Sequence, residues 1–147
     1  MKPINEMNVT IPSRSSNESF ARVAVSAFIA QLDPTLEEVN DIKTAVSEAV
    51  TNCIVHAYRE SIGQIHITVH ILGHGLIRIK IRDTGCGIDD IDQAMQPLFT
   101  TAGGERAGLG FAVMQSFMDS VKVRSRVGSG TIVTMQKQLA LRAGNHA

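Results

Sequence analysis

The stretch that decides the fold is residues 64–88, QIHITVHILGHGLIRIKIRDTGCGI. Isoleucine and valine alternate with polar side chains over 64–71, and the alternation resumes over 77–82 after a turn at 73–75. Successive side chains of a strand point to opposite faces, so this pattern predicts a β-hairpin with one apolar face and one wet face. A sheet of this kind is covered by helices on one face only.

Three further stretches, 8–11, 121–127 and 130–133, alternate in the same way and predict additional strands. Together with helical patterns on the N-terminal side of the hairpin, they predict an α/β (α+β) fold. The expected architecture is a two-layer sandwich, in which a mixed, mostly antiparallel sheet carries its helices on one face.

Two capping boxes mark the predicted helices. Thr35 and Glu38 have the spacing of such a box, in front of a long apolar pattern that keeps helical spacing to Ala57. Ser15 and Glu18 have the same spacing before a first helix. The apolar positions of that first helix are Phe20, Val23, Ala24, Ala27 and Phe28.

Length and composition exclude several classes of protein. The chain has 147 residues, with 14 basic and 14 acidic side chains and therefore no net charge. A protein that coats nucleic acid usually has a clear excess of basic residues, so this class is not expected. A single domain over 1–147 fits this length, and no apolar run is long enough to span a membrane. Cys53 and Cys86 have no metal-ligand spacing, so we expect reduced thiols and a cytoplasmic protein.

Glu48, Asn52 and His56 form the first polar feature. Their spacing of four residues places them in one stripe along the long helix, beside its apolar side. A carboxylate can act as a base, and an amide oxygen suits Mg²⁺. The alternative is the ordinary polar flank of an amphipathic helix.

Asp83, Gly85 and Gly87 form the second, directly after a predicted strand. An aspartate at a strand end can accept a hydrogen bond from an exocyclic amine, and glycines allow close approach to a flat base. The alternative is a simple turn. Asp-Thr-Gly also occurs in aspartic proteases, but those need a second catalytic aspartate in an equivalent setting, which this sequence does not offer.

Gly108, Leu109 and Gly110 form the third, at the opening of an apolar helical stretch. Amides at a helix start and the positive end of its dipole bind phosphate. On its own the pattern is also typical of an ordinary helix start, and it is not a Walker A loop. Residues 84–107 between the second and third features lack periodicity, as a lid would.

In this order, the three features resemble the Bergerat ATP-binding fold of the gyrase, Hsp90, histidine kinase and MutL superfamily. Residues 48–56 resemble its N box, 83–87 its first glycine box and 108–110 its second. The whole chain resembles the anti-sigma factor kinases, in particular the serine kinases of sporulation. The segments that carry this closer resemblance are 17–23 (NESFARV), 46–52 (VSEAVTN) and 96–101 (QPLFTT).

The resemblance implies a serine/threonine-protein kinase that uses ATP and Mg²⁺ to phosphorylate a serine of an anti-anti-sigma protein. It also implies a homodimer that binds and inhibits a sporulation sigma factor of the sigma F type. Neither a nucleic acid nor a membrane is expected as a direct partner. The alternative is a nucleotide-gated module that sequesters sigma without kinase activity. The presence of Glu48 favours the kinase, because a pure binding module needs no base.

The resemblance also implies roles for individual residues. Glu48 would be the general base, Asn52 would bind Mg²⁺, and Arg22 would contact the sigma factor. Adenine would be held by Asp83 and Thr131 together with the backbone around Gly85 and Gly87. Residues 88–107 would close as a lid, and the phosphates would meet Thr100, Thr101, Arg106, Gly108, Leu109 and Gly110. The segments 58–63 and 102–105 are shorter than is usual in the family, which bears on the lid contacts.

Overall fold

A computed structural model describes residues 2–95 and 105–140, with only the backbone path for 105–109. Its centre is a five-stranded sheet in the order β1-β2-β3-β5-β4. The strands are β1 (Asn5–Pro12), β2 (Gln64–Ile71), β3 (Leu76–Asp83), β4 (Ser120–Arg126) and β5 (Gly130–Gln138). All four strand pairs are antiparallel, so the described sheet has none of the parallel pairing that a mixed sheet allows.

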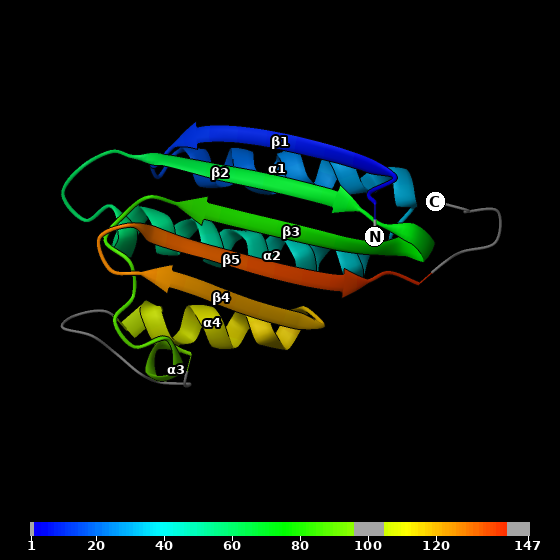
Figure 1. The fold of residues 1–147 in the computed structure, drawn as a ribbon. Helices are drawn as coiled ribbons and strands as arrows, with labels where there is room; N and C mark the ends of the chain where they lie inside the picture. The colour runs from blue at the N-terminus through cyan, green and yellow to red at the C-terminus, as the bar shows by residue number, and fades with distance from the viewer. Residues whose placement is uncertain (1, 96–104, 141–147) are drawn as a thin grey trace.

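The long helices lie together on one side of this sheet, as the two-layer prediction required (Figure 1). They are α1 (Asn17–Ile29), α2 (Leu36–Asn52) and α4 (Glu105–Phe117). Short helical turns complete the order: η1 (Ala30–Leu32), η2 (Cys53–Ala57), η3 (Gly73–Gly75) and α3 (Ile91–Ala94). No helix in the described ranges is long and apolar enough to cross a membrane.

The predicted hairpin supplies the centre of the core. β2 and β3 pair as an antiparallel hairpin, and their apolar residues are at most 1% exposed: Ile65, Ile67, Val69, Ile71, Ile77, Ile79 and Ile81. Each such side chain contributes roughly 1.5–3 kcal/mol when it is fully buried. The polar residues between them stay on the open face. Alternation therefore both fixes the register and separates the two faces of the sheet.

The capping box of α2 is confirmed. Thr35 Oγ1 accepts a hydrogen bond from the Glu38 backbone N–H at 3.0 Å, and Glu38 Oε1 accepts one from the Thr35 N–H at 2.8 Å. The same carboxylate also accepts the N–H of Ala140 at 2.8 Å. The start of α2 is thus tied to the segment that directly follows β5.

The capping box predicted for α1 is wrong. The helix starts after Ser16, without a side-chain cap. The Glu18 carboxylate instead accepts hydrogen bonds from the hydroxyls of Ser47 at 2.6 Å and Thr51 at 2.7 Å, both on α2. The Glu18 carboxylate thus takes two hydrogen bonds from the neighbouring helix in place of the single backbone N–H that a capping box would give it.

The side of α1 that faces the core also differs from the apolar pattern. Ala21, Val25 and Ile29 are fully buried, whereas Phe20 and Val23 are 50% and 57% exposed. Small and branched side chains let α1 lie close to α2, and of the predicted apolar positions Phe28 still packs partly against the core.

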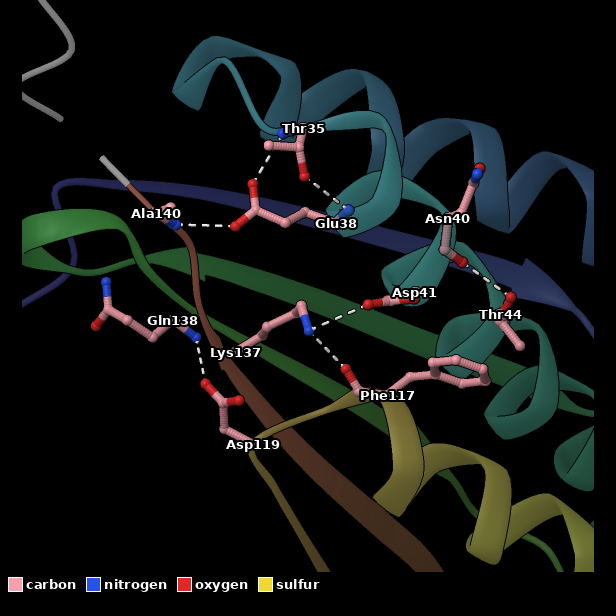
Figure 2. A network of polar contacts seen from close by, with 10 residues as sticks. All are labelled: Thr35, Glu38, Asn40, Asp41, Thr44, Phe117, Asp119, Lys137, Gln138 and Ala140. Atoms are coloured by element: carbon pink, nitrogen blue, oxygen red, sulfur yellow. Dashed lines mark hydrogen bonds and ion pairs between the residues drawn. The ribbon is translucent and has the colours of Figure 1, made fainter. Parts of the chain in front are cut away.

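A polar network connects the C-terminal end of β5 to the helices (Figure 2). Lys137 Nζ donates to the carbonyl oxygen of Phe117 at 2.7 Å and lies 3.5 Å from Asp41 Oδ2. The lysine therefore caps the C-terminus of α4, where a cation is favoured by the helix dipole. Asp119 Oδ2 accepts the Gln138 N–H at 2.6 Å nearby.

Candidate functional site

A cavity of about 270 Å³ opens where α2 ends, beside the last residues of β3. It brings together residues from two of the predicted motifs and from β5. The predicted residues that line it are Asn52, His56, Asp83, Gly87 and Thr131. Sequence reasoning missed other lining residues, among them Cys53, Arg59, Phe111 and Val133. Cys53 lies within the apolar helical pattern that runs to Ala57, which gives no sign of a place at the cavity.

Asp83 lies at the base of this cavity and is only 6% exposed. Its Oδ1 accepts the backbone N–H of Gly85 at 2.9 Å and that of Thr131 at 3.2 Å. Its Oδ2 accepts the thiol hydrogen of Cys53, with 3.5 Å between sulfur and oxygen. Protein donors thus fix the carboxylate plane, while Oδ2 keeps acceptor capacity on the cavity side.

The Cys53 thiol remains a donor in this position. Burial raises the pKa of Cys53 well above its usual value, and the nearby Asp83 charge raises it further. A thiolate beside a buried carboxylate would place two negative charges together. Cys53 therefore acts as a neutral partner of Asp83.

The end of the long helix departs from the α-helical pattern expected as far as Ala57. The chain turns as a π-helix from Cys53 to Ala57, a rare element that is frequent at functional sites. The Ala57 carbonyl then accepts the N–H of Cys86 at 3.1 Å. A β-carbon on Gly85 would lie 2.4 Å from the same carbonyl oxygen, so only glycine fits this contact. The π turn at 53–57 and the loop at 84–87 are therefore in direct backbone contact.

Gly110 brings the third motif against the first. A β-carbon on this buried glycine would lie 3.2 Å from Asn52 Oδ1 and 3.4 Å from Glu48 Oε2. The backbone of helix α4 at Gly110 therefore lies close to the side chains of Glu48 and Asn52. The Asn52 Nδ2 atom is buried and has no hydrogen-bond partner among the described residues. A buried amide without a protein partner can be satisfied by a water or a polar ligand beside it.

The remaining predicted residues lie as follows. The predicted helix start at Gly108 is wrong: α4 begins at Glu105, so Arg106, Gly108 and Leu109 lie within its first turns, and only the first four backbone N–H groups, up to Gly108, are free of intrahelical bonds. Thr100 and Thr101 lie outside the described residues. Arg22 is on α1 and away from the cavity lining; its Nη2 donates to Ser19 Oγ at 3.2 Å.

Residues 11–137 match the family described as histidine kinase-like ATPase domain. The chain is 57% identical to the anti-sigma F factor of Thermoanaerobacter sp. (strain X514), over 95% of this chain and 97% of that protein. It is 58% identical to the anti-sigma F factor of Caldanaerobacter subterraneus subsp. tengcongensis, over 92% and 94% of the two chains.

Among solved structures, the chain is similar to the RsbU and RsbW domains of Rv1364c from Mycobacterium tuberculosis. The TM-score is 0.69 at 19% identity, and the match covers 93% of this chain and 32% of that one. At this identity the likeness concerns the fold, which agrees with the two-layer architecture and its sheet described above.

Proposed function

The chain belongs to the anti-sigma F factors, within the histidine kinase-like ATPase domain family, and on that premise we propose that it is an ATP-dependent serine/threonine-protein kinase. It binds and inhibits a sporulation sigma factor of the sigma F type, and it phosphorylates a serine of the cognate anti-anti-sigma protein. It does so as a cytoplasmic homodimer of single-domain chains.

One observation carries this proposal: a fixed buried acceptor, Asp83, shares a cavity with Asn52, and Glu48 lies one helical turn before Asn52. Asp83 accepts a hydrogen bond from the 6-amino group of adenine, assisted by Thr131 and the backbone at Gly85 and Gly87. The phosphates then extend toward the start of α4. They reach residues 108–110, Arg106 and a lid over 88–107 that includes Thr100 and Thr101.

The side chains beside α4 fit a bound Mg²⁺. Asn52 offers an amide oxygen to the ion, and its buried Nδ2 is a donor that a phosphate oxygen beside the ion can satisfy. The described residues contain no cluster of three His, Cys, Asp or Glu side chains. Magnesium needs none, because it keeps several waters and takes oxygens from substrate phosphates. When bound, the ion supplies charge neutralisation for phosphoryl transfer.

Glu48 is the proposed general base. A carboxylate on the same side of α2 as Asn52 can accept the proton of a substrate serine hydroxyl while the phosphoryl group is transferred. Phosphoryl transfer depends mainly on positioning and charge neutralisation. The rigid crossing of α2 by α4 at Gly110 supports both.

Gly110→Ala is expected to weaken nucleotide binding about tenfold without lowering thermal stability. The added methyl group would push on Asn52 and Glu48, whereas alanine favours a helix over glycine by roughly 1 kcal/mol. Calorimetric titration with ADP and thermal unfolding measure the two effects. Gly73→Ala is the control, since its β-carbon would meet open space. Equal affinities for wild type and Gly110→Ala would contradict the close approach.

Arg22→Ala is expected to lower co-purification of the sigma factor about tenfold and to leave nucleotide affinity unchanged, because Arg22 lies away from the cavity. Arg14→Ala, an exposed arginine just before α1, is the control. Co-purification of sigma with Arg22→Ala at the wild-type level would remove Arg22 from the sigma contact.

The second candidate function is a nucleotide-gated module that holds sigma without transferring phosphate. The position of Glu48 beside Asn52 favours the kinase. Incubation with γ-labelled ATP and the anti-anti-sigma protein separates the two, since only a kinase moves label to the partner's serine.

A further inference from the structure

Ser125 lies on β4 beside the cavity, and its hydroxyl makes three contacts. The backbone N–H of Ile88 donates to Ser125 Oγ at 2.7 Å. Ser125 Oγ donates to the carbonyl oxygen of Gly130 at 3.1 Å and lies 2.8 Å from Thr131 Oγ1. Thr131 lines the cavity, whereas Ser125 stands behind it.

Counting hydrogens assigns the direction of each contact. A hydroxyl has one hydrogen and two acceptor lone pairs. Ile88 fills one lone pair of Ser125, and the Gly130 carbonyl, which can only accept, takes the hydrogen. The Thr131 contact is then made with the hydrogen of Thr131, donated to the second lone pair of Ser125. This arrangement alone satisfies all three contacts, and it leaves Thr131 Oγ1 as an acceptor only.

Asp83 stands directly opposite Thr131 in the β3–β5 register. Its carboxylate oxygens also accept, and backbone donors already occupy Oδ1. The cavity therefore meets a ligand with two neighbouring acceptors. An exocyclic amine supplies hydrogens to such a pair, whereas a carbonyl oxygen would face lone pairs at the same place.

We propose that Ser125 sets the base specificity of this site: by holding the Thr131 hydroxyl as an acceptor, it makes the cavity select 6-amino purines over 6-oxo purines. Ser125 is a positioning residue that acts through Thr131. The inference rests on the proposed nucleotide-binding function and deepens it. A hydroxyl can donate or accept a hydrogen bond, and Ser125 is the residue that leaves the Thr131 hydroxyl able only to accept one from the ligand.

The test compares ADP with IDP, whose bases differ in the 6-amino or 6-oxo group and in the N1 hydrogen that accompanies the 6-oxo form. Dissociation constants for both are measured by calorimetry with Mg²⁺. We expect Ser125→Ala to reduce the preference for ADP over IDP about tenfold, because Thr131 is then free to donate. Ser125→Thr keeps the hydroxyl and restores the preference. Ser129→Ala, an exposed serine in the turn of the same hairpin, keeps the wild-type preference.

A double-mutant cycle with Thr131→Val tests whether Ser125 acts through Thr131. Thr131→Val alone should also lower the preference, while Ser125 retains its contacts to Ile88 and Gly130. In the Thr131→Val background, Ser125→Ala should not change the preference further. If Ser125→Ala does not fold, the Thr131→Val single variant still decides whether the Thr131 hydroxyl reads the base.

Two results would overturn the inference while the proposed function stands. One is an unchanged ADP:IDP ratio in Ser125→Ala or Thr131→Val; the other is the same fall in ratio for Ser125→Ala whether residue 131 is threonine or valine. A wild-type protein that binds neither diphosphate would instead refute the proposed function, and the inference with it.

Discussion

Asp83→Asn is expected to weaken ATP binding about 100-fold or more. The side-chain oxygen of asparagine will stay at Oδ1, where two backbone N–H groups need an acceptor. The NH₂ group then replaces Oδ2 and faces two donors, the Cys53 thiol and the adenine amine. A lost hydrogen bond to a charged group costs about 1.5–3 kcal/mol, and an unsatisfied buried donor adds about 1–3 kcal/mol.

Calorimetric titration of ATP into Asp83→Asn measures this loss, and thermal unfolding confirms that the variant is folded. Asp33→Asn is the matched control, since Asp33 is exposed and does not line the cavity. An Asp83→Asn affinity within threefold of wild type would show that adenine is held elsewhere.

Glu48→Gln is expected to bind ATP within about threefold of wild type and to lose phosphoryl transfer by about 100- to 10,000-fold. The amide has the same shape as the carboxylate, so its contact with α4 at Gly110 is preserved. It cannot accept the proton of a serine hydroxyl, and general bases contribute about 10²–10⁴ to rates.

The rate of label transfer from ATP to the anti-anti-sigma protein measures this change. Glu37→Gln, an exposed acid in the first turn of α2, removes the same charge away from the cavity. If Glu48→Gln transferred phosphate at the wild-type rate, Glu48 would not be the base. If it lost ATP binding instead, its role would lie in binding.

Those parts of the fold that rest on local periodicity could be predicted from the sequence. The β2–β3 hairpin follows from strict alternation, and the start of α2 from the Thr35–Glu38 spacing. The buried face of α1 could not be predicted in this way, because apolar residues occur on two of its sides. Packing against α2 decides between those sides, and Glu18 loses its capping role to donors that lie 29 and 33 residues away.

The candidate site divides along the same line. Asp83, Asn52 and Thr131 could be predicted, since the order of motifs places them. The π turn at 53–57 could not, because its sequence is compatible with a continued α-helix. The sequence carries a signal for Ser125. In the alternating pattern of β4, Ser125 falls on the same side of the strand as Val121 and Val123, opposite to the exposed Lys122 and Arg124. A polar residue on the inner side of a strand needs a buried partner.

The most direct test of the central claim is the fate of the γ-phosphate. The wild-type protein is incubated with γ-labelled ATP, Mg²⁺ and the anti-anti-sigma protein, and the labelled residue is mapped by mass spectrometry. We predict one phosphate on a serine of that partner, and none in the same time with Glu48→Gln. Unlabelled partner in a reaction where ATP is bound and sigma is held would contradict the account and leave a nucleotide-gated sequestering module in its place.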